Sequence, residues 1–372
     1  MRGETGKQKS MMIVFNVEAK IRKDHPVRQI KALADEALVR LSPVFDGMYS
    51  KTGRPSIPPE RLLKSVLLMA LYSVPSERQF CERLDLDFLF RWFLDMDVSE
   101  DAFDPTTFTQ NRDRLLAHAV AEKFFHEVVL MARAKDLMSD EHFSVDGTLI
   151  EAWASMKSFR PRDEKPEDRP KGDGGSNGWV DFSGEKRSNA THASTTDPEA
   201  NLLKKSKGQS AKLCYTGHAL MDNRNGLLHD FWVTPSVGIT EGEAAGAMLE
   251  GAGLRGSPER GISVGADKGY DNEGFVEDCR DLGIIPHVAR KKNGAMDEAT
   301  ALTLGYSISQ RLRKRIEEIF GWMKTVACFR KSRFIGLEKT RMAGYFVGTA
   351  YNLMRIARWK PRVVNAEAPE AA

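Results

Sequence analysis

The sequence changes character near residue 140, and this change limits the folds that are open to the chain. Before Asp140, apolar residues recur at helical spacing between breaks that contain Pro or Gly, and no strand pattern occurs. After Glu141, short apolar runs alternate with helical stretches. We therefore expect an all-helical domain over residues 25–140 and a mixed α+β or α/β domain over residues 141–358. Residues 1–24 and 359–372 are expected to form a mobile N-terminal segment and a C-terminal tail.

The second half of the chain predicts a mixed sheet flanked by helices. Asn225-Gly226 lies between apolar runs at 212–221 and 227–235, which is a strong signal for a hairpin. Further strands are expected at 143–146, 261–266 and 284–289, with helices at 241–252, 272–282 and 342–356. Residues 155–210 are strand-poor and rich in Pro, Gly and charge. Such a long insert in a compact domain is usually functional or disordered.

The first half contains the outline of a helix-turn-helix. Pro58-Pro59 opens a helix over residues 60–72, Ser73-Val74-Pro75 breaks it, and Ser76 caps a short helix to Leu84. Two helices joined by a three-residue turn fit a DNA-reading unit, but they also fit an ordinary helical hairpin. Other helices are expected from His25-Pro26 through Val39 and over residues 120–134.

Composition excludes several classes of protein. The net charge is only +3, so any nucleic-acid surface must be local. The four cysteines form no C-x-x-C pair, which argues against a zinc knuckle. The most apolar run, residues 66–72, is too short to span a bilayer. No phosphate-binding G-x-x-x-x-G-K-[ST] loop occurs. We expect a cytoplasmic, nucleoid-associated protein with no membrane and no nucleotide partner.

The stretch from Ser309 to Lys324 predicts one amphipathic helix with a charged stripe beside its buried face. At about 100° per residue, Arg313, Glu317 and Lys324 lie within roughly 40° of one another, whereas Glu318 falls on the solvent side. A carboxylate between cations beside a core suits a metal or phosphate site. Ordinary i,i+4 ion pairs on a surface helix are the alternative interpretation.

Two further acids lie at the ends of predicted strands: Asp146 is the last residue of one, and Asp267 directly follows another. Acids at strand ends point into the crevice where ligands bind in sheets of this type. Together with Glu317 they could converge on hard divalent cations, whose preferred ligands are carboxylate oxygens and water. Taken one at a time, each Asp is better explained as a turn or capping residue, and only the combination with the charged helix favours a metal site.

A basic patch surrounds these acids. Residues 287–333 hold eleven Lys or Arg and four Asp or Glu, so this region carries a net charge of +7 in a chain of net +3. A concentration of this kind is the electrostatic footprint of a polyanion partner. DNA contacts are expected from Arg313, Lys324, Lys268, Lys314, Arg315, Lys291 and Lys292.

These motifs resemble those of bacterial insertion-sequence transposases of the DDE class, in the family named after insertion sequence five (IS-five). The resemblance rests on HFSVDGTLIEAWAS, AKLCYTGHALMDNRNG, SVGADKGYD and SQRLRKRIEEIFGWMKT, and on GRPSIPPERLL and DPTTFTQNRDRLL in the first half. The family's helix signature is Tyr, two residues, Arg, three residues, Glu, six residues, Lys. Arg313, Glu317 and Lys324 keep this spacing, while position 310 is Gln rather than Tyr.

The resemblance implies a helical DNA-recognition domain followed by a ribonuclease H-like catalytic domain. It implies that Asp146, Asp267 and Glu317 are the catalytic residues and hold two Mg²⁺ ions, with Mn²⁺ as a substitute. The expected function is binding of terminal inverted repeats, cleavage at the element ends, and transfer of 3′-hydroxyl ends to target DNA. The synaptic complex is expected to contain a homodimer or a higher oligomer. A nuclease of the same fold and a DNA-binding protein with a silent site are the alternatives.

Overall fold

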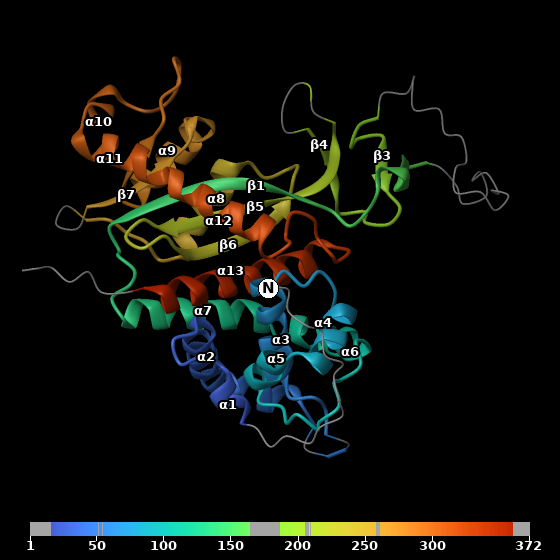
Figure 1. Ribbon diagram of the computed structural model, residues 1–372. Helices are drawn as coiled ribbons and strands as arrows, with labels where there is room; N and C mark the ends of the chain where they lie inside the picture. Colours follow the sequence, from blue (N-terminus) through green and yellow to red (C-terminus); the bar gives the residue numbers. More distant parts are fainter. Residues whose placement is uncertain are drawn as a thin grey trace, which may run out of the picture.

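The first half of the chain is helical, as predicted (Figure 1). The computed structural model describes residues 16–50, 52, 53, 55–163, 187–204, 208, 210–257 and 261–359. Its first seven helices are α1 (Val17–Lys20), α2 (Pro26–Met48), α3 (Pro59–Leu71), α4 (Glu77–Leu86), α5 (Phe88–Phe93), α6 (Thr106–Ala117) and α7 (Val120–Ala134). The predicted cap of α4 is present, because the Ser76 hydroxyl accepts a hydrogen bond from the backbone N–H of Gln79.

Two boundaries in this half differ from expectation. Helix α2 does not end near Val39 but continues to Met48, because Leu41, Phe45 and Met48 extend its buried stripe past Pro43. Residues 16–24, expected within a mobile segment, contain α1. The Glu18 carboxylate accepts hydrogen bonds from the Arg28 guanidinium of α2 and from the Trp92 indole of α5. These bonds hold the segment against both helices. Residues 1–15 lie outside the described chain.

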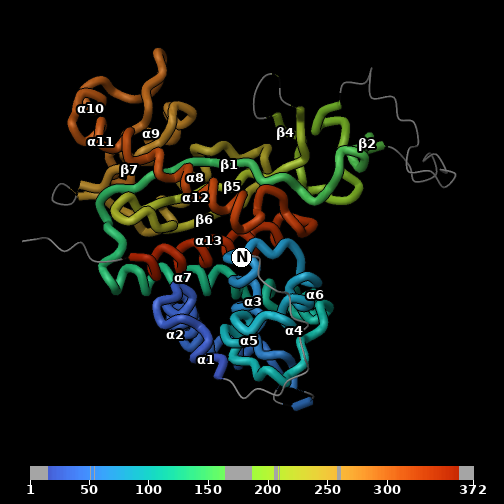
Figure 2. The backbone as a smooth tube through the Cα atoms, viewed as in Figure 1, coloured from blue at the N-terminus to red at the C-terminus, as the bar shows by residue number. Residues whose placement is uncertain are grey.

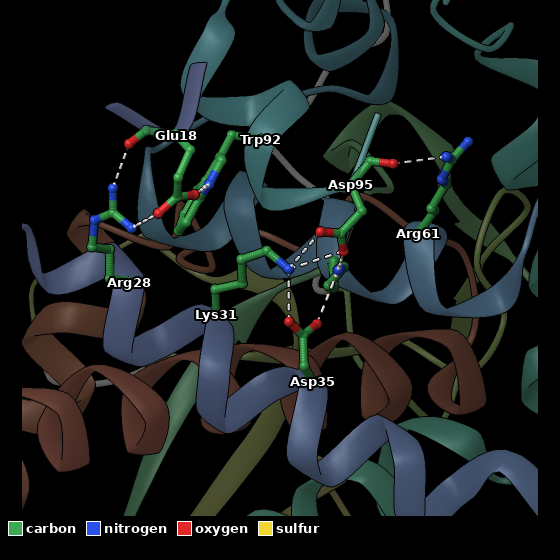
Figure 3. Close-up of polar contacts among 8 residues, drawn as sticks. Glu18, Arg28, Lys31, Asp35, Arg61, Trp92 and Asp95 are labelled. Carbon is green, nitrogen blue, oxygen red and sulfur yellow. Dashed lines mark hydrogen bonds and ion pairs between the residues drawn. The ribbon is translucent and has the colours of Figure 1, made fainter. Parts of the chain in front are cut away.

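A box of alternating charges joins α2, α3 and the turn after α5 (Figure 3). Lys31 lies 2.7 Å from Asp35 and 2.8 Å from Asp95. Lys64, whose side chain is only 4% exposed, lies 2.9 Å from Asp35 and 2.5 Å from Asp95. Each ammonium therefore meets two carboxylates, which compensates for the burial of Lys64.

The second half contains the predicted mixed sheet. Its strands are β1 (His142–Glu151), β4 (Asn201–Leu203), β5 (Lys212–Asp222), β6 (Leu227–Pro235), β7 (Ile262–Ala266) and β8 (Ile284–Val288). The order is β4-β5-β1-β7-β8, and β6 also pairs with β5. Strands β5 and β6 form the predicted hairpin. Strand β1 is antiparallel to β5 and parallel to β7, which is parallel to β8.

The prediction that the first strand ends at Asp146 is wrong. Strand β1 runs on to Glu151, because residues 143–151 pair continuously with β5 and Gly147 lies opposite His218. Gly147 lies within the strand, and the Glu241 side chain packs over it. A Cβ atom at this position would lie 2.5 Å from the Glu241 carboxylate.

The insert is less strand-poor than expected. Strands β2 (Phe159–Pro161) and β3 (His192–Ser194) form a separate two-stranded sheet, and β4 extends the main sheet. These strands are short and pair with strands far away in the sequence, so no local sequence pattern predicts them. Residues 164–186, 205–207 and 209 of the insert lie outside the described chain.

Helices cover both faces of the sheet. Helices α8 (Glu241–Gly251) and α9 (Glu273–Asp281) enclose one cluster of buried apolar residues with Phe143 and Val145 of β1. The opposite face of β1 meets a helical segment made of α11 (Leu304–Leu312), the 3₁₀ turn η4 (Arg313–Arg315) and α12 (Ile316–Thr325). The short helix α10 (Glu298–Ala301) precedes this segment.

The C-terminal helix α13 (Leu337–Arg358) lies between the sheet and the helical half (Figures 1 and 2). The Asn352 amide hydrogen-bonds both the N–H and the C=O of Leu228 on β6. On its other side, Tyr345 contacts Phe125 of α7 at a ring distance of 5.6 Å. One cluster of buried apolar residues therefore includes members of both halves of the chain. Across the described ranges, no helix is long and apolar enough to cross a membrane.

Candidate active site

Asp146 and Asp267 lie at equivalent levels of two neighbouring parallel strands. The last parallel pair between β1 and β7 is Ser144 with Gly265, and each acid lies two residues further along its strand. Beyond Ala266 the β7 backbone leaves the sheet, and the Asp267 carboxylate accepts a hydrogen bond of 2.6 Å from the N–H of Gly269. The expectation of an acid at a strand end therefore holds for Asp267. Asp146 lies within β1, at the point where pairing with β7 stops.

The helical segment that carries Glu317 is not one uninterrupted α-helix, as was predicted. The turn Arg313–Arg315 is 3₁₀, which is tighter than an α-helix and lies where the segment packs closely on the sheet. A Cβ atom on Gly265 would lie 2.9 Å from the Ser309 hydroxyl and 3.3 Å from the Arg313 Cβ. Most of the buried face expected for this stretch is confirmed, since Ile316, Ile319, Phe320, Met323 and Ala327 are buried, whereas Leu312 is only half-buried.

One face of β1 lies along this helical segment and contacts it at both ends. His142 Nε2 lies 2.7 Å from the Ser309 hydroxyl at one end, and the Lys324 ammonium donates a hydrogen bond to the Thr148 hydroxyl at the other. Between these contacts, the Arg313 guanidinium favours the ionised form of Asp146. Glu317 lies between Arg313 and Lys324 on the helices, as Asp146 lies between His142 and Thr148 on the strand. The Glu317 side chain is exposed.

Gln310, the position at which the family signature has Tyr, connects this segment to the sheet. Its amide nitrogen donates hydrogen bonds to the carbonyl oxygens of Ala266 and His287, the latter at 2.5 Å. Its amide oxygen accepts a hydrogen bond of 2.9 Å from Arg313 Nε. Gln310 therefore fixes the Arg313 side chain relative to the strand end from which Asp267 projects.

A third acid near the strand acids, Glu241, was missed in the sequence. It begins α8, which starts with a capping box between Thr240 and Glu243, and its carboxylate lies over Gly147. The signal that could have identified it is topological. Strand β6 runs parallel to β1 because both are antiparallel to β5, so the chain after β6 reaches the same part of the sheet edge as the chain after β7.

These acids repel one another. Burial, together with the negative charges of Asp267 and Glu241, raises the pKa of Asp146 to about 6, although the Gly147 N–H and Arg313 act in the opposite direction. Burial and the charge of Asp267 also raise the pKa of Glu241. Burial, with the charges of Glu241, Asp146 and Asp267, raises the pKa of Tyr270 well above its usual value. The region therefore holds more negative charge than the protein itself neutralises.

The carboxylates of Asp146, Asp267 and Glu241 suit a hard divalent cation, because carboxylate oxygens are the ligands that Mg²⁺ and Mn²⁺ prefer. A bound cation would also relieve the repulsion that raises the pKa of Asp146. Within the described part of the chain, no three His, Cys, Asp or Glu side chains are close enough to form a metal-binding group. The structure brings Asp146 near Asp267 and Glu241, and Glu317 is exposed on the helical segment beside β1.

The predicted DNA-contacting residues are distributed around the acids. Lys268 directly follows Asp267 and is exposed, as are Lys292, Lys314 and Arg315. The Lys291 ammonium donates hydrogen bonds to the carbonyl oxygens of Gly269 and Asp271, at 3.2 and 3.0 Å. The basic loop that contains Lys291 is thereby held against the turn that follows Asp267.

Comparison with known families defines the class of protein. Residues 15–114 match the Transposase domain (DUF772), and residues 189–353 match the Transposase DDE domain. The chain therefore contains a transposase DDE domain, preceded by a second transposase domain. Asp267 and Glu317 fall within the second match, whereas Asp146 lies between the two. No match was found among the curated proteins.

Among solved structures, the chain is similar to a piggyBac transposase synaptic complex with hairpin DNA. The identity is 8%, the TM-score is 0.37, and 92% of this chain and 81% of that chain are covered. The Mos1 strand transfer complex matches at 10% identity with a TM-score of 0.20, covering 82% of this chain and 79% of that chain. A pre-cleavage Mos1 transpososome matches at 11% identity with the same TM-score, covering 82% of each chain. TM-scores this low do not establish a common fold, so the class rests on the two domain matches.

Proposed function

We propose that the protein is an insertion-sequence transposase of the IS-five family. It would bind the terminal inverted repeats of its element, cleave the DNA at the element ends, and join the resulting 3′-hydroxyl ends to target DNA. The observation that carries this proposal is the alignment of Asp146 with Asp267, beside a helical segment that presents Arg313, Glu317 and Lys324 along the same strand.

Asp146, Asp267 and Glu317 are the residues that would hold two Mg²⁺ ions, with Mn²⁺ as a substitute. Bound there, the ions would activate water or a 3′-hydroxyl and stabilise the leaving 3′-oxygen. Glu317 is exposed, and the three acids do not form a metal-binding group within the described residues. Its convergence on them is therefore part of the proposal.

The remaining residues of the site would bind and orient DNA phosphates. Arg313, held by Gln310, can offer two parallel N–H donors to one phosphate. Lys324 hydrogen-bonds Thr148, which lies two residues after Asp146 on β1, and supplies a single positive charge there. Lys268, Lys291, Lys292, Lys314 and Arg315 would extend this surface and contribute affinity without reading sequence.

The same proposal assigns different roles to the two halves of the chain. Residues 25–140 would recognise DNA, with α3 and α4 as the helix-turn-helix unit. Residues 141–358 would form the ribonuclease H-like catalytic domain. The strand order β6-β5-β1-β7-β8, with only β5 antiparallel to the rest, supports this assignment. Cleavage at paired ends would require a homodimer or a higher oligomer.

The test uses the purified chain, Mg²⁺ and pre-cleaved duplexes that carry the inverted repeats flanking its gene. We expect joined products from the wild-type protein. Glu317→Gln should abolish joining while end binding is retained, and Glu277→Gln, at an exposed carboxylate of α9, should leave joining within about threefold. Full joining by Glu317→Gln would exclude the proposed role of Glu317.

The same assay separates the alternatives. A nuclease of this fold would hydrolyse intact ends in a metal-dependent reaction but give no joined product from pre-cleaved ends. A DNA-binding protein with a silent site would bind the ends and cut nothing.

A further inference from the structure

A cleft rich in arginine lies away from the acids, between the tip of the β5–β6 hairpin and the end of α13. Its volume is about 490 Å³. Four arginines line it, together with Trp359 and a single carboxylate, Glu318; they are Arg224, Arg315, Arg355 and Arg358. We call this set the arginine cleft. None of the acids at the candidate active site takes part in it.

The hairpin turn holds two of these arginines in place. Arg355 Nη2 donates a hydrogen bond of 2.6 Å to the carbonyl oxygen of Asn225, and Arg315 Nη1 donates one of 3.2 Å to that of Asn223. Both side chains therefore converge on one short loop from different elements, since Arg315 belongs to η4 and Arg355 to α13. A guanidinium has five N–H donors, so these contacts fix the groups while using a minority of their donors.

Carboxylates neutralise the cleft only in part. Glu318 lies 3.5 Å from Arg355, and Asp136, outside the cleft, lies 2.9 Å from Arg224. The four guanidinium groups face only one lining carboxylate, so the cleft has an excess of positive charge. Arginines repel one another when they are brought together, and the arrangement is stabilised when an anion enters.

The chemistry of the cleft selects phosphate groups on a polymer. Guanidinium groups bind phosphate oxygens through paired N–H donors, and four of them along one cleft can contact successive phosphates. Trp359, which is 44% exposed, offers a flat ring on which a sugar or an unpaired base can pack. Arg315 lies two residues from Arg313, whose charge reaches Asp146. A duplex at the active site can therefore continue around η4 into the cleft.

We propose that the arginine cleft binds the phosphate backbone of DNA outside the catalytic centre and so fixes the position of the duplex. This inference rests on the proposed function, because it takes DNA to be the substrate. It assigns Arg224, Arg355, Arg358 and Trp359 to a binding site that is separate from the three acids.

The experiment measures binding of the full chain to a labelled 30-base-pair duplex by fluorescence anisotropy, over a series of salt concentrations. The test variant is Arg224→Ala/Arg358→Ala, because both residues are exposed and, unlike Arg315 and Arg355, neither is seen to hydrogen-bond a carbonyl oxygen of the hairpin turn. The matched control is Arg255→Ala/Arg280→Ala, which removes the same charge from two other exposed positions.

We expect the test variant to bind about tenfold more weakly at 0.1 M salt. The slope of log K against log salt should fall by about two, since each lost phosphate contact lowers it by about 0.9. The control should keep both the affinity and the slope of the wild type.

Three outcomes would overturn the inference, and they are distinguishable. If the wild type binds DNA and both double variants bind equally well, the cleft is not a DNA site, whereas the proposed function stands. If the wild type binds no duplex, the proposed function fails as well. If inorganic phosphate alone stabilises the wild type but not the test variant against thermal unfolding, and DNA affinity is unchanged, the cleft is a site for small anions.

Discussion

Asp146 and Asp267 both lie two residues beyond the Ser144–Gly265 pair, the last pair of the parallel ladder between β1 and β7. The register of that ladder therefore sets the two acids at one level of the sheet. Past Gly265 the strands part: β1 continues along β5, while the chain after Ala266 turns into η3. The separation of the strands opens the space that the acids occupy, and it does so without any strained residue at Asp146.

The first prediction concerns the charge of Asp146. Because the folded state raises its pKa to about 6 from an ordinary value near 4, ionisation penalises the folded state, and stability falls as the pH rises from about 4 to 6. Asp146→Asn should therefore raise the free energy of unfolding by about 2 kcal/mol at pH 7.5 in metal-free buffer. Near pH 4 the gain should disappear. Thermal melts of both proteins across this range measure the effect, and an equal gain at both pH values would contradict the electrostatic cause.

A second prediction concerns Gln310, which we interpret as a positioning residue for Arg313. Gln310→Ala removes the acceptor of Arg313 Nε and the two donors to the sheet, so it should slow strand transfer by about tenfold. In an Arg313→Ala background the same substitution should cost less than about threefold, because the residue that it positions is gone. Equal losses in both backgrounds would show that Gln310 acts only on the packing of the helical segment.

The third prediction concerns the charge box of the helical half. Hydrogen bonds from Lys31 and Lys64 outweigh the effect of burial and lower the pKa of Asp95. Lys64→Met removes one of these partners and leaves Asp35 and Asp95 facing Lys31 alone. We expect it to destabilise the fold by about 1–3 kcal/mol at pH 7, since Asp95 is partly exposed and solvent screens the box.

The sign of the pH dependence distinguishes this cause from lost packing. A carboxylate with a lowered pKa stabilises the folded state above its unfolded pKa, and this contribution is lost as the pH falls through the folded value. The deficit of Lys64→Met should therefore shrink below about pH 4. Chemical denaturation at pH 7 and pH 3.5 tests this, with Lys339→Met, at an exposed ion pair with Asp113, as the control.

Much of the fold could be predicted because its signals are local. The Asn225-Gly226 turn, the cap at Ser76 and the periodicity of α7 and α13 each act over a few residues. The length of β1 could not be predicted, because a glycine often ends a strand, and the pairing of Gly147 with His218 of β5 depends on the folded chain. The 3₁₀ turn at Arg313 likewise depends on the close approach to Gly265, which no local pattern contains.

The candidate site divides in the same way. The spacing of Arg313, Glu317 and Lys324 was visible in the sequence because they share one helical segment. The proximity of Glu241 to Asp146 depends on the course of the chain after β6, and the arginine cleft unites residues from the hairpin, η4 and α13. Contacts between elements far apart in sequence carry no periodic signal, so such sites emerge only from the folded chain.

The last prediction tests whether Glu241 belongs to the ion site. In metal-free buffer at pH 7.5, Glu241→Gln should stabilise the fold, because it removes a charge that burial and Asp267 disfavour. If Glu241 also helps to hold a divalent ion, the same variant should lose most of the rise in melting temperature that 10 mM Mg²⁺ gives the wild type. Glu250→Gln, an exposed residue of the same helix, provides the control and should behave as the wild type in both buffers. A variant that is more stable without metal, yet keeps the full Mg²⁺ response, would show that Glu241 repels the site acids without contacting the ion.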